Sequence, residues 1–266
     1  MTIALSEILA SRRLEGDTVT FNATEDWMQG RTMFGGFLSA LAVVAMRDTL
    51  SLDIPLRALQ TNFVGPVAMG EVLYRTRLLR QGKNITQVHC EIWSQDAFAG
   101  LVVGVFGTGR ETALPAKTAV HTPLPKGPDE VMALPFIPKV TPNFTQHVDM
   151  RWAIGGVPYT GLQSTQSGIH IRAKDANLSP EILVVMLSDG PPTPVLSCFK
   201  GPVMASSVSW SLELPPLPLQ LDSTAWYQID MDTIAMSEGY VNQSARLWTA
   251  DGRLLSLGYQ VVAVYG

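Results

Sequence analysis

Residues 34–50, with the sequence FGGFLSALAVVAMRDTL, decide the fold of this chain. Two glycines, Gly35 and Gly36, stand before a run that is rich in Ala, Leu and Met and contains no proline. Such a run predicts a buried helix over residues 35–50 that begins at a glycine turn. The segments that follow this helix indicate what it packs against.

Four strand candidates come next along the chain. Their residues are β-branched or alternate between apolar and polar, and short GP, MG, QGKN and QD segments separate them. The candidates are Leu56–Val64, Glu71–Arg80, Ile85–Ser94 and Phe98–Phe106. A helix followed by four consecutive strands predicts an α+β unit with an antiparallel sheet, and not a series of βαβ units.

The C-terminal half repeats this order. Asn177–Asp189 is a helix candidate, with Ser179 as its N-cap and Pro180 at its first helical position. Strand candidates follow at Ala205–Leu214, Trp226–Met231, Gly239–Trp248 and Leu254–Tyr265. Trp93 and Trp248, 155 residues apart, each precede a turn that contains Asp, and the two repeats close on Val-Phe-Gly and Val-Tyr-Gly. The match predicts an internal duplication.

The segment between the two halves has a different character. From about Arg110 to Thr145 the chain is rich in proline and shows little periodicity. A loop of this length inside one domain is unusual. We therefore predict an N-terminal domain over residues 1–112, a Pro-rich linker over 113–144 and a C-terminal domain over 145–266.

Composition excludes several classes of protein. The chain has 266 residues, 46% of them hydrophobic, and a net charge of −4 without any cluster of Lys and Arg. This argues against disorder and against nucleic acid as a partner. The longest apolar run, Phe37–Met46, is far shorter than the roughly 20 residues that span a bilayer. Together with an N-terminus unlike a secretory signal, it predicts a cytoplasmic protein without membrane insertion.

The reactive side chains fit no metal or cofactor site. Two cysteines, Cys90 and Cys198, form no disulfide framework, and the four histidines lack the spacing of metal ligands. We therefore expect no metal and no cofactor, and we interpret both thiols as inert.

Three polar residues in the C-terminal half stand out instead. Asp189 ends an apolar helix candidate, where a carboxylate lies at the unfavourable end of the helix dipole. It is either a solvent-facing residue at the helix end or a group that orients or deprotonates a water. Ser207 lies near the start of a strand, and Gln260 interrupts the apolar strand LGYQVVAV. A buried Gln there needs hydrogen-bond partners, whereas an outward-facing Gln does not.

Taken together, these segments resemble the acyl-CoA thioesterase II (TesB-like) family of double hot-dog thioesterases. Phe34–Phe37 is similar to the family's FGG segment before the first helix, and 59–67 (LQTNFVGPV) is similar to a strand of its first domain. Leu187–Asp189 matches the LSD that closes the second helix. Ser207–Ser209 falls where the family has Thr-hydrophobic-Asp, and Gln260 falls on a Gln of the last strand.

The resemblance implies an α+β double hot-dog fold, in which each of two fused units wraps an antiparallel sheet around a long helix. It also implies hydrolysis of acyl-CoA to free acid and CoA, an activity of fatty acid metabolism, by a water that Asp189, Ser207 and Gln260 hold. Here Ser207 stands where the family has Thr, and Ser206 offers a competing alignment.

Two further expectations concern the substrate oxygen and the assembly. We expect the amides of Gly35 and Gly36 to bind the thioester oxygen, because a helix N-terminus favours negative charge and glycine permits close approach. Hot-dog sheets pair with one another, so we also expect a homodimer or a larger homo-oligomer.

Two other functions stay open at this stage. Hot-dog domains also serve as enoyl-CoA hydratases, which use an Asp–His pair, and no His accompanies Asp189 or the first helix. The departures at Ser207 and Ser209 also leave room for a non-catalytic protein that binds acyl-CoA or an acyl carrier.

Overall fold

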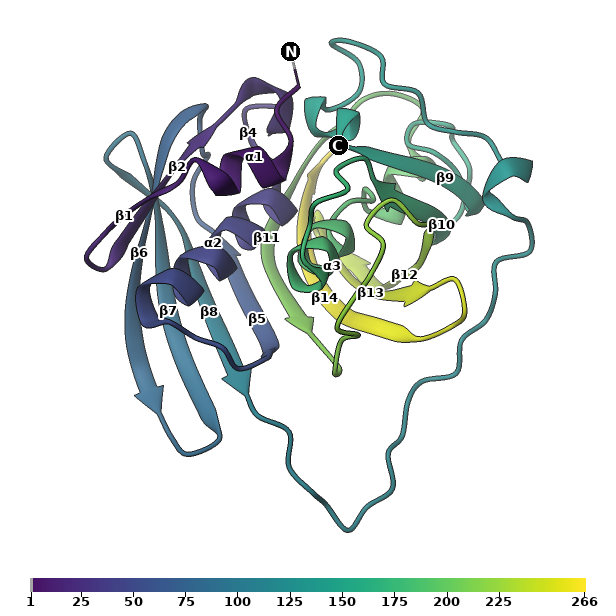
Figure 1. Cartoon of the computed structure of the whole chain (residues 1–266). Helices are drawn as coiled ribbons and strands as arrows, with labels where there is room; N and C mark the ends of the chain where they lie inside the picture. Colours follow the sequence, from purple (N-terminus) through teal and green to yellow (C-terminus); the bar gives the residue numbers. More distant parts are fainter. Residues whose placement is uncertain (1) are drawn as a thin grey trace.

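The structure, a computed structural model, describes residues 2–266. Within this range twelve strands form one antiparallel sheet, and two helices lie side by side against its concave face (Figure 1). The first half contains α1 (Leu5–Ala10), β1 (Arg13–Glu15), β2 (Thr18–Ala23), the 3-10 turn η1 (Glu25–Trp27), β3 (Met28–Gln29), β4 (Thr32–Met33), α2 (Gly35–Leu50), β5 (Leu56–Phe63), β6 (Gly70–Gln81), β7 (Ile85–Ser94) and β8 (Ala97–Gly107).

The second half repeats the pattern. It contains η3 (Asn143–Gln146), β9 (Val148–Ile154), β10 (Gln166–Ala173), α3 (Pro180–Ser188), η4 (Pro194–Cys198), β11 (Met204–Glu213), β12 (Tyr227–Ser237), β13 (Tyr240–Thr249) and β14 (Leu254–Tyr265). In the sheet, β1-β2-β6-β7-β8-β5 continue as β11-β14-β13-β12-β10-β9. The second series mirrors the first around the β5–β11 pair, as a duplicated chain would. The predicted antiparallel α+β arrangement, with four strands after each helix, is thereby confirmed.

The helix α2 is buried along most of its length because its residues are small and apolar. Eleven of its residues, from Gly35 to Met46, are buried. A helix that is apolar on every side can only lie inside a protein or a membrane. Here the sheet and α3 enclose it. Within residues 2–266, no helix is both long and apolar enough to cross a bilayer.

The second helix differs from its prediction. It covers Pro180–Ser188, so the predicted start, with Ser179 as N-cap and Pro180 first in the helix, is confirmed, but the helix is shorter than the candidate over residues 177–189. Pro180 can stand only in the first turn, because its ring excludes a preceding helical residue. Ser179 does occupy the N-cap position, but its side chain makes no capping hydrogen bond. At the other end, Asp189 is the C-cap and Gly190 leaves the helix.

The sequence reasoning also missed the strands that precede each helix. In the large sheet these are β1 and β2 in the first half and β9 and β10 in the second, and the short pair β3–β4 was missed as well. β1 is only three residues long, whereas β9 carries a usable signal in its alternation of buried Val148, Met150 and Trp152 with less buried residues.

The Pro-rich segment between the halves is partly fixed to the sheet. Its first part forms the long outer loop of Figure 1, where Val120 is 86% exposed. Its second part lies on the outer face of the C-terminal half. There the side chain of Gln228 accepts a hydrogen bond from the Leu124 N–H at 3.1 Å and donates one to the Thr122 carbonyl at 2.8 Å.

An aromatic stack joins the second half to the beginning of α2. The rings of Trp27 and His147 lie parallel at 3.8 Å, and Trp27 also stacks on Phe37 of α2. His147 Nε2 lies 2.8 Å from the buried carboxylate of Asp26. This stack fixes the glycine turn at residues 35–36 relative to the C-terminal half.

Candidate active site

Asp189 lies where the two central helices meet. It is the C-cap of α3, and the N-terminus of α2 lies opposite it. A carboxylate at a helix C-terminus is unfavourable, but the positive end of a second helix compensates for it. The Gly36 N–H of α2 forms a hydrogen bond to this carboxylate. The position that looked unfavourable in the sequence is therefore stabilised by a neighbour from the other half.

Gln260 brings the three predicted side chains together. Its Nε2 donates a hydrogen bond of 2.9 Å to Asp189 Oδ1 and one of 2.8 Å to Ser207 Oγ. The three residues come from α3, β11 and β14, and no local sequence pattern could join them. All three are half-buried, so the group remains accessible to a small molecule.

A β-bulge turns Ser207 toward this site. Along β11 the pairing with β14 shifts register between Ser207 and Ser209, which leaves Val208 as an extra residue. Without the bulge, strict alternation would place Ser207 on the face opposite that of buried Trp210. Ser206 is exposed, and among residues 2–266 its hydroxyl makes a single hydrogen bond, of 3.5 Å, to the Ser207 carbonyl. Of the two hydroxyls considered from the sequence, that of Ser207 lies next to Gln260.

Burial changes the chemistry of Asp189. Desolvation by the groups packed around it raises the pKa of its carboxyl to about 7, although the hydrogen bonds from Gln260 and Gly36 favour the charged form. The surroundings are tightly packed: a Cβ added to Gly35 would lie 2.7 Å from Asp189 Oδ2 and 2.9 Å from the ring of Phe63. A carboxylate with a pKa near neutrality suits a general base.

The glycine turn lies beside the carboxylate, as expected, and one of its amides interacts with that carboxylate. The first N–H groups of a helix have no partner within the helix. Among these, the Gly36 amide already interacts with Asp189. Gly36 thus helps to hold the carboxylate.

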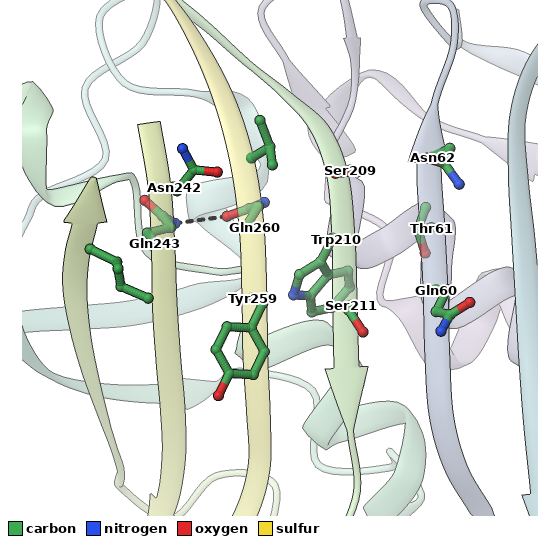
Figure 2. Close-up of a pocket in the computed structure, with 12 residues that line it drawn as sticks. Gln60, Thr61, Asn62, Ser209, Trp210, Ser211, Asn242, Gln243, Tyr259 and Gln260 are labelled. Atoms are coloured by element: carbon green, nitrogen blue, oxygen red, sulfur yellow. Dashed lines mark hydrogen bonds between the residues drawn. The ribbon is translucent and has the colours of Figure 1, made fainter. Parts of the chain in front are cut away.

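The sequence reasoning missed Gln243 of β13. This residue is 3% exposed, and its Nε2 donates a hydrogen bond of 2.8 Å to Gln260 Oε1 (Figure 2). A signal was present in the sequence. Alternation along β13 places Gln243 on the same face as buried Val241, and a buried Gln needs partners.

The hollow shown in Figure 2 lies on the other face of the sheet. It has a volume of about 410 Å³, and exposed Gln60, Asn62 and Tyr259 are among its lining residues. Neighbouring residues of a strand point to opposite faces. Since Gln260 points toward α3, Tyr259 points away from it. Gln243 and Gln260 are also among its lining residues, so the hollow borders the strands β13 and β14, and β14 carries part of the Asp189 site.

The cysteines and histidines lie away from Asp189. Cys90 is buried, and its burial raises the pKa of its thiol far above the usual range. His147 pairs with Asp26. Over residues 2–266, the hydrogen bonds to the Asp189 carboxylate come from Gln260 and Gly36, and none comes from a histidine. An Asp–His pair of the hydratase type is thus not formed at Asp189.

Comparisons with solved structures identify the fold. A hot-dog-fold protein of unknown function from Alicyclobacillus acidocaldarius is 18% identical, with a TM-score of 0.86 over 100% of this chain and 99% of that chain. An acyl-CoA thioesterase II from Mycobacterium marinum is 14% identical, with a TM-score of 0.78 over 98% of each chain. The dehydratase domain of RzxB from Pseudomonas fluorescens is 10% identical, with a TM-score of 0.58 over 99% of this chain and 100% of that domain. The chain therefore has a hot-dog fold.

Family models identify the family. A search of curated protein sequences gives no significant match. The model of the acyl-CoA thioesterase N-terminal domain matches residues 23–108, and that of the acyl-CoA thioesterase C-terminal domain matches residues 128–264. The second match alone covers more than half of the chain. The chain therefore belongs to the acyl-CoA thioesterase family and is a thioester hydrolase.

Proposed function

We propose that the chain is a double hot-dog enzyme that hydrolyses acyl-CoA to free acid and CoA at the site formed by Asp189, Ser207 and Gln260. The mirrored strand order supports two fused units, of which the second wraps a short helix. The observation that carries the function is the convergence of these three side chains opposite the glycine turn of the first half.

In the proposed reaction, Asp189 acts as the general base. Its carboxylate removes a proton from a water that Ser207 holds and that Gln260 positions through its hydrogen bonds to Asp189 and Ser207, and the water oxygen forms a bond to the thioester carbonyl carbon. The carbonyl oxygen becomes negatively charged, and the amides at the N-terminus of α2, chiefly that of Gly35, stabilise it. The C–S bond then breaks, the acid leaves, and the CoA thiolate takes the proton from Asp189.

Two observations favour hydrolysis over the other functions. The dehydratase neighbour shows that the fold alone does not select the reaction. The site supports hydrolysis, because Asp189 is hydrogen-bonded by two neutral amides and not by a histidine. In addition, a carboxyl with a pKa of about 7 costs stability as a charged group, and a protein that only binds ligands has no use for this cost.

The test is an assay of acyl-CoA esters of several chain lengths, with release of the free thiol as the readout. We expect thiol release by the natural chain and a loss of roughly 10²–10⁴-fold in Asp189→Asn, which keeps the shape and removes the base. Binding without thiol release would indicate a binding protein. Hydration of an enoyl-CoA would indicate a hydratase.

We also propose that two copies of the chain associate through the outer face of the central strands. Ile234, Tyr240 and Tyr259 are each more than half exposed on or beside this face. Light scattering at micromolar concentration should give the mass of a dimer or a larger oligomer. The Tyr259→Lys variant should have a lower measured mass, because a charge would then lie in the contact. A monomer in the natural chain would contradict this assembly.

A further inference from the structure

Gln260 can serve the site in only one orientation of its amide. Ionised Asp189 can only accept hydrogen bonds, so Gln260 must direct Nε2 toward it, where the same nitrogen also donates to Ser207. Its Oε1 then points away from the site and needs a donor. If the amide turned over, its carbonyl oxygen would face the carboxylate and repel it.

Gln243 supplies this donor from the neighbouring strand. The two residues are directly opposite in the β13–β14 register, and Gln243 Nε2 lies 2.8 Å from Gln260 Oε1. Figure 2 shows this bond across the two strands. The hydrogen bonds therefore form a chain from Gln243 to Gln260 and from there to Asp189 and Ser207.

Gln243 donates at an energetic cost. With its Nε2 directed to Gln260, its own Oε1 is buried without a hydrogen-bond partner among residues 2–266. A buried unsatisfied acceptor costs roughly 1–3 kcal/mol, and an apolar side chain at this position would avoid that cost. Fold stability alone therefore does not explain a glutamine here.

The next strand provides a group that can reduce this cost. Thr233 of β12 is directly opposite Gln243 in the register, and its Oγ1 is likewise buried and unpaired among the described residues. Side chains opposite one another in adjacent strands lie within reach of each other. Neither oxygen has a hydrogen-bond partner among the described residues, so the Thr233 side chain would have to turn about χ1 to donate to Gln243 Oε1.

We propose that Gln243 is a positioning residue, which holds the Gln260 amide with its N–H groups toward Asp189 and Ser207. This inference rests on the proposed thioesterase function and extends the site by one strand. Gln243 does not touch the reacting atoms. It acts through Gln260.

The proposal predicts an effect on the titration of Asp189. The groups packed around this carboxylate are all uncharged, namely Gly35 and Gly36 of α2, Phe63 of β5, Ser207 of β11 and Gln260 of β14. Their hydrogen bonds therefore set its titration together with burial. Without Gln243 the Gln260 amide can turn over, which replaces a donor by an acceptor and disfavours the ionised carboxylate.

The experiment compares Gln243→Met with the natural chain. Met has a similar volume and cannot donate to Gln260. We expect kcat for acyl-CoA hydrolysis to fall roughly 5- to 10-fold, with KM changed less than about twofold, because one hydrogen bond is lost. The acidic limb of the pH profile should move upward by roughly one unit. A normal kcat and an unmoved limb would overturn the proposal.

A double-mutant cycle and a matched control separate positioning from folding. If Gln243 acts through Gln260, Gln243→Met should add almost no further loss of kcat in a Gln260→Ala background. Additive losses would contradict the proposal. The control is Gln228→Met on β12, a glutamine of similar burial whose partners are Leu124 and Thr122 of the Pro-rich segment. It should lower stability without moving the pH limb.

A readout without turnover keeps the proposal separate from the proposed function. The carboxyl carbon of Asp189 can be titrated by NMR in the natural chain and in Gln243→Met. An upward shift of the Asp189 pKa in the variant supports the positioning role even if the natural chain hydrolyses none of the acyl-CoA esters. An equal pKa in both proteins would overturn the positioning role even if the natural chain is an active thioesterase.

Discussion

The helices α2 and α3 run side by side in opposite directions, and their two meeting points are built differently. At one, the C-terminus of α2 meets the N-terminus of α3, and Arg47 forms two hydrogen bonds of 2.7 Å to the carboxylate of Glu181. Each charge lies at the helix end that favours it. At the other, Asp189 lies at the unfavourable end of α3 and faces neutral amides.

The difference separates stability from reactivity. The charges of Arg47 and Glu181 are paired with each other, and Arg47 also donates hydrogen bonds to the carbonyls of Leu52 and Ile54. Such a pair is unavailable for chemistry. Asp189 has hydrogen bonds but no counter-ion among residues 2–266, so burial raises its pKa to about 7. Two related halves thus use equivalent junctions for different purposes.

The largest effect that separates the two junctions should be the pH dependence of activity. Only ionised Asp189 can accept the proton of the water, so kcat/KM should rise with pH and reach half of its maximum near pH 7. At pH 5 it should be roughly 100-fold lower. The absorbance of the thioester bond measures the rate at each pH. An acidic limb of the pH profile near pH 4 would contradict the assignment of Asp189 as the general base. The control variant, Glu181→Gln, should leave the acidic limb where it is in the natural chain.

A smaller loss of activity should follow from Gly35→Ala. The new Cβ would lie 2.7 Å from Asp189 Oδ2 and 2.9 Å from the ring of Phe63, so the carboxylate must move. We expect turnover to fall roughly 10- to 100-fold, because a displacement of about 1 Å has effects of this size. Gly109→Ala is the control, since nothing lies within 4 Å of its added Cβ. Equal activity in the two variants would contradict the close packing at Asp189.

At the other junction, Glu181→Gln should lower stability and spare activity. It leaves the half-buried Arg47 without its counter-ion. We expect the free energy of unfolding, measured in urea, to fall by roughly 2 kcal/mol, a figure that allows for the partial exposure of both side chains. The thiol-release assay should change less than about twofold. An unchanged unfolding midpoint would show that this junction does not stabilise the fold.

The smallest expected effect is a gain in stability from Asp189→Asn. The folded-state pKa of about 7 lies above the ordinary value of 3.8, so the folded chain retains a proton that the unfolded chain releases. Asp189 therefore lowers stability increasingly as the pH rises from about 4 to 7. Asn carries no charge. The Asp189→Asn variant should therefore melt at a higher temperature at pH 8, by roughly 2–4 °C for each kcal/mol that its free energy of unfolding gains.

Calorimetry at pH 8 and pH 4.5 tests this gain. The difference between Asp189→Asn and the natural chain should shrink at the lower pH, where the natural carboxyl is largely protonated in the folded state. A gain that is equal at both pH values would show that the charge is not its cause.

The sequence alone determined the periodic elements. Gly35–Leu50 and Ile85–Ser94 are as predicted, and Leu254–Tyr265 agrees in full, because long apolar or alternating runs carry their own period. It also indicated Asp189 and Gln260, since a carboxylate at a helix end and a glutamine in an apolar strand each break a local rule. The strand β1 has only three residues, too few for a period to show, whereas the six residues of β2 do alternate and that signal was missed.

Tertiary structure alone decided the contacts that give these residues their chemistry. Whether Ser206 or Ser207 faces Gln260 depends on the bulge at Val208, which forms only when β11 pairs with β14. The pKa of Asp189 depends on burial and on the amide of Gly36, about 150 residues away in the chain. Gln243 contacts Gln260 through strand register. These effects act between atoms that are close in space, and sequence periodicity describes only neighbours along one element.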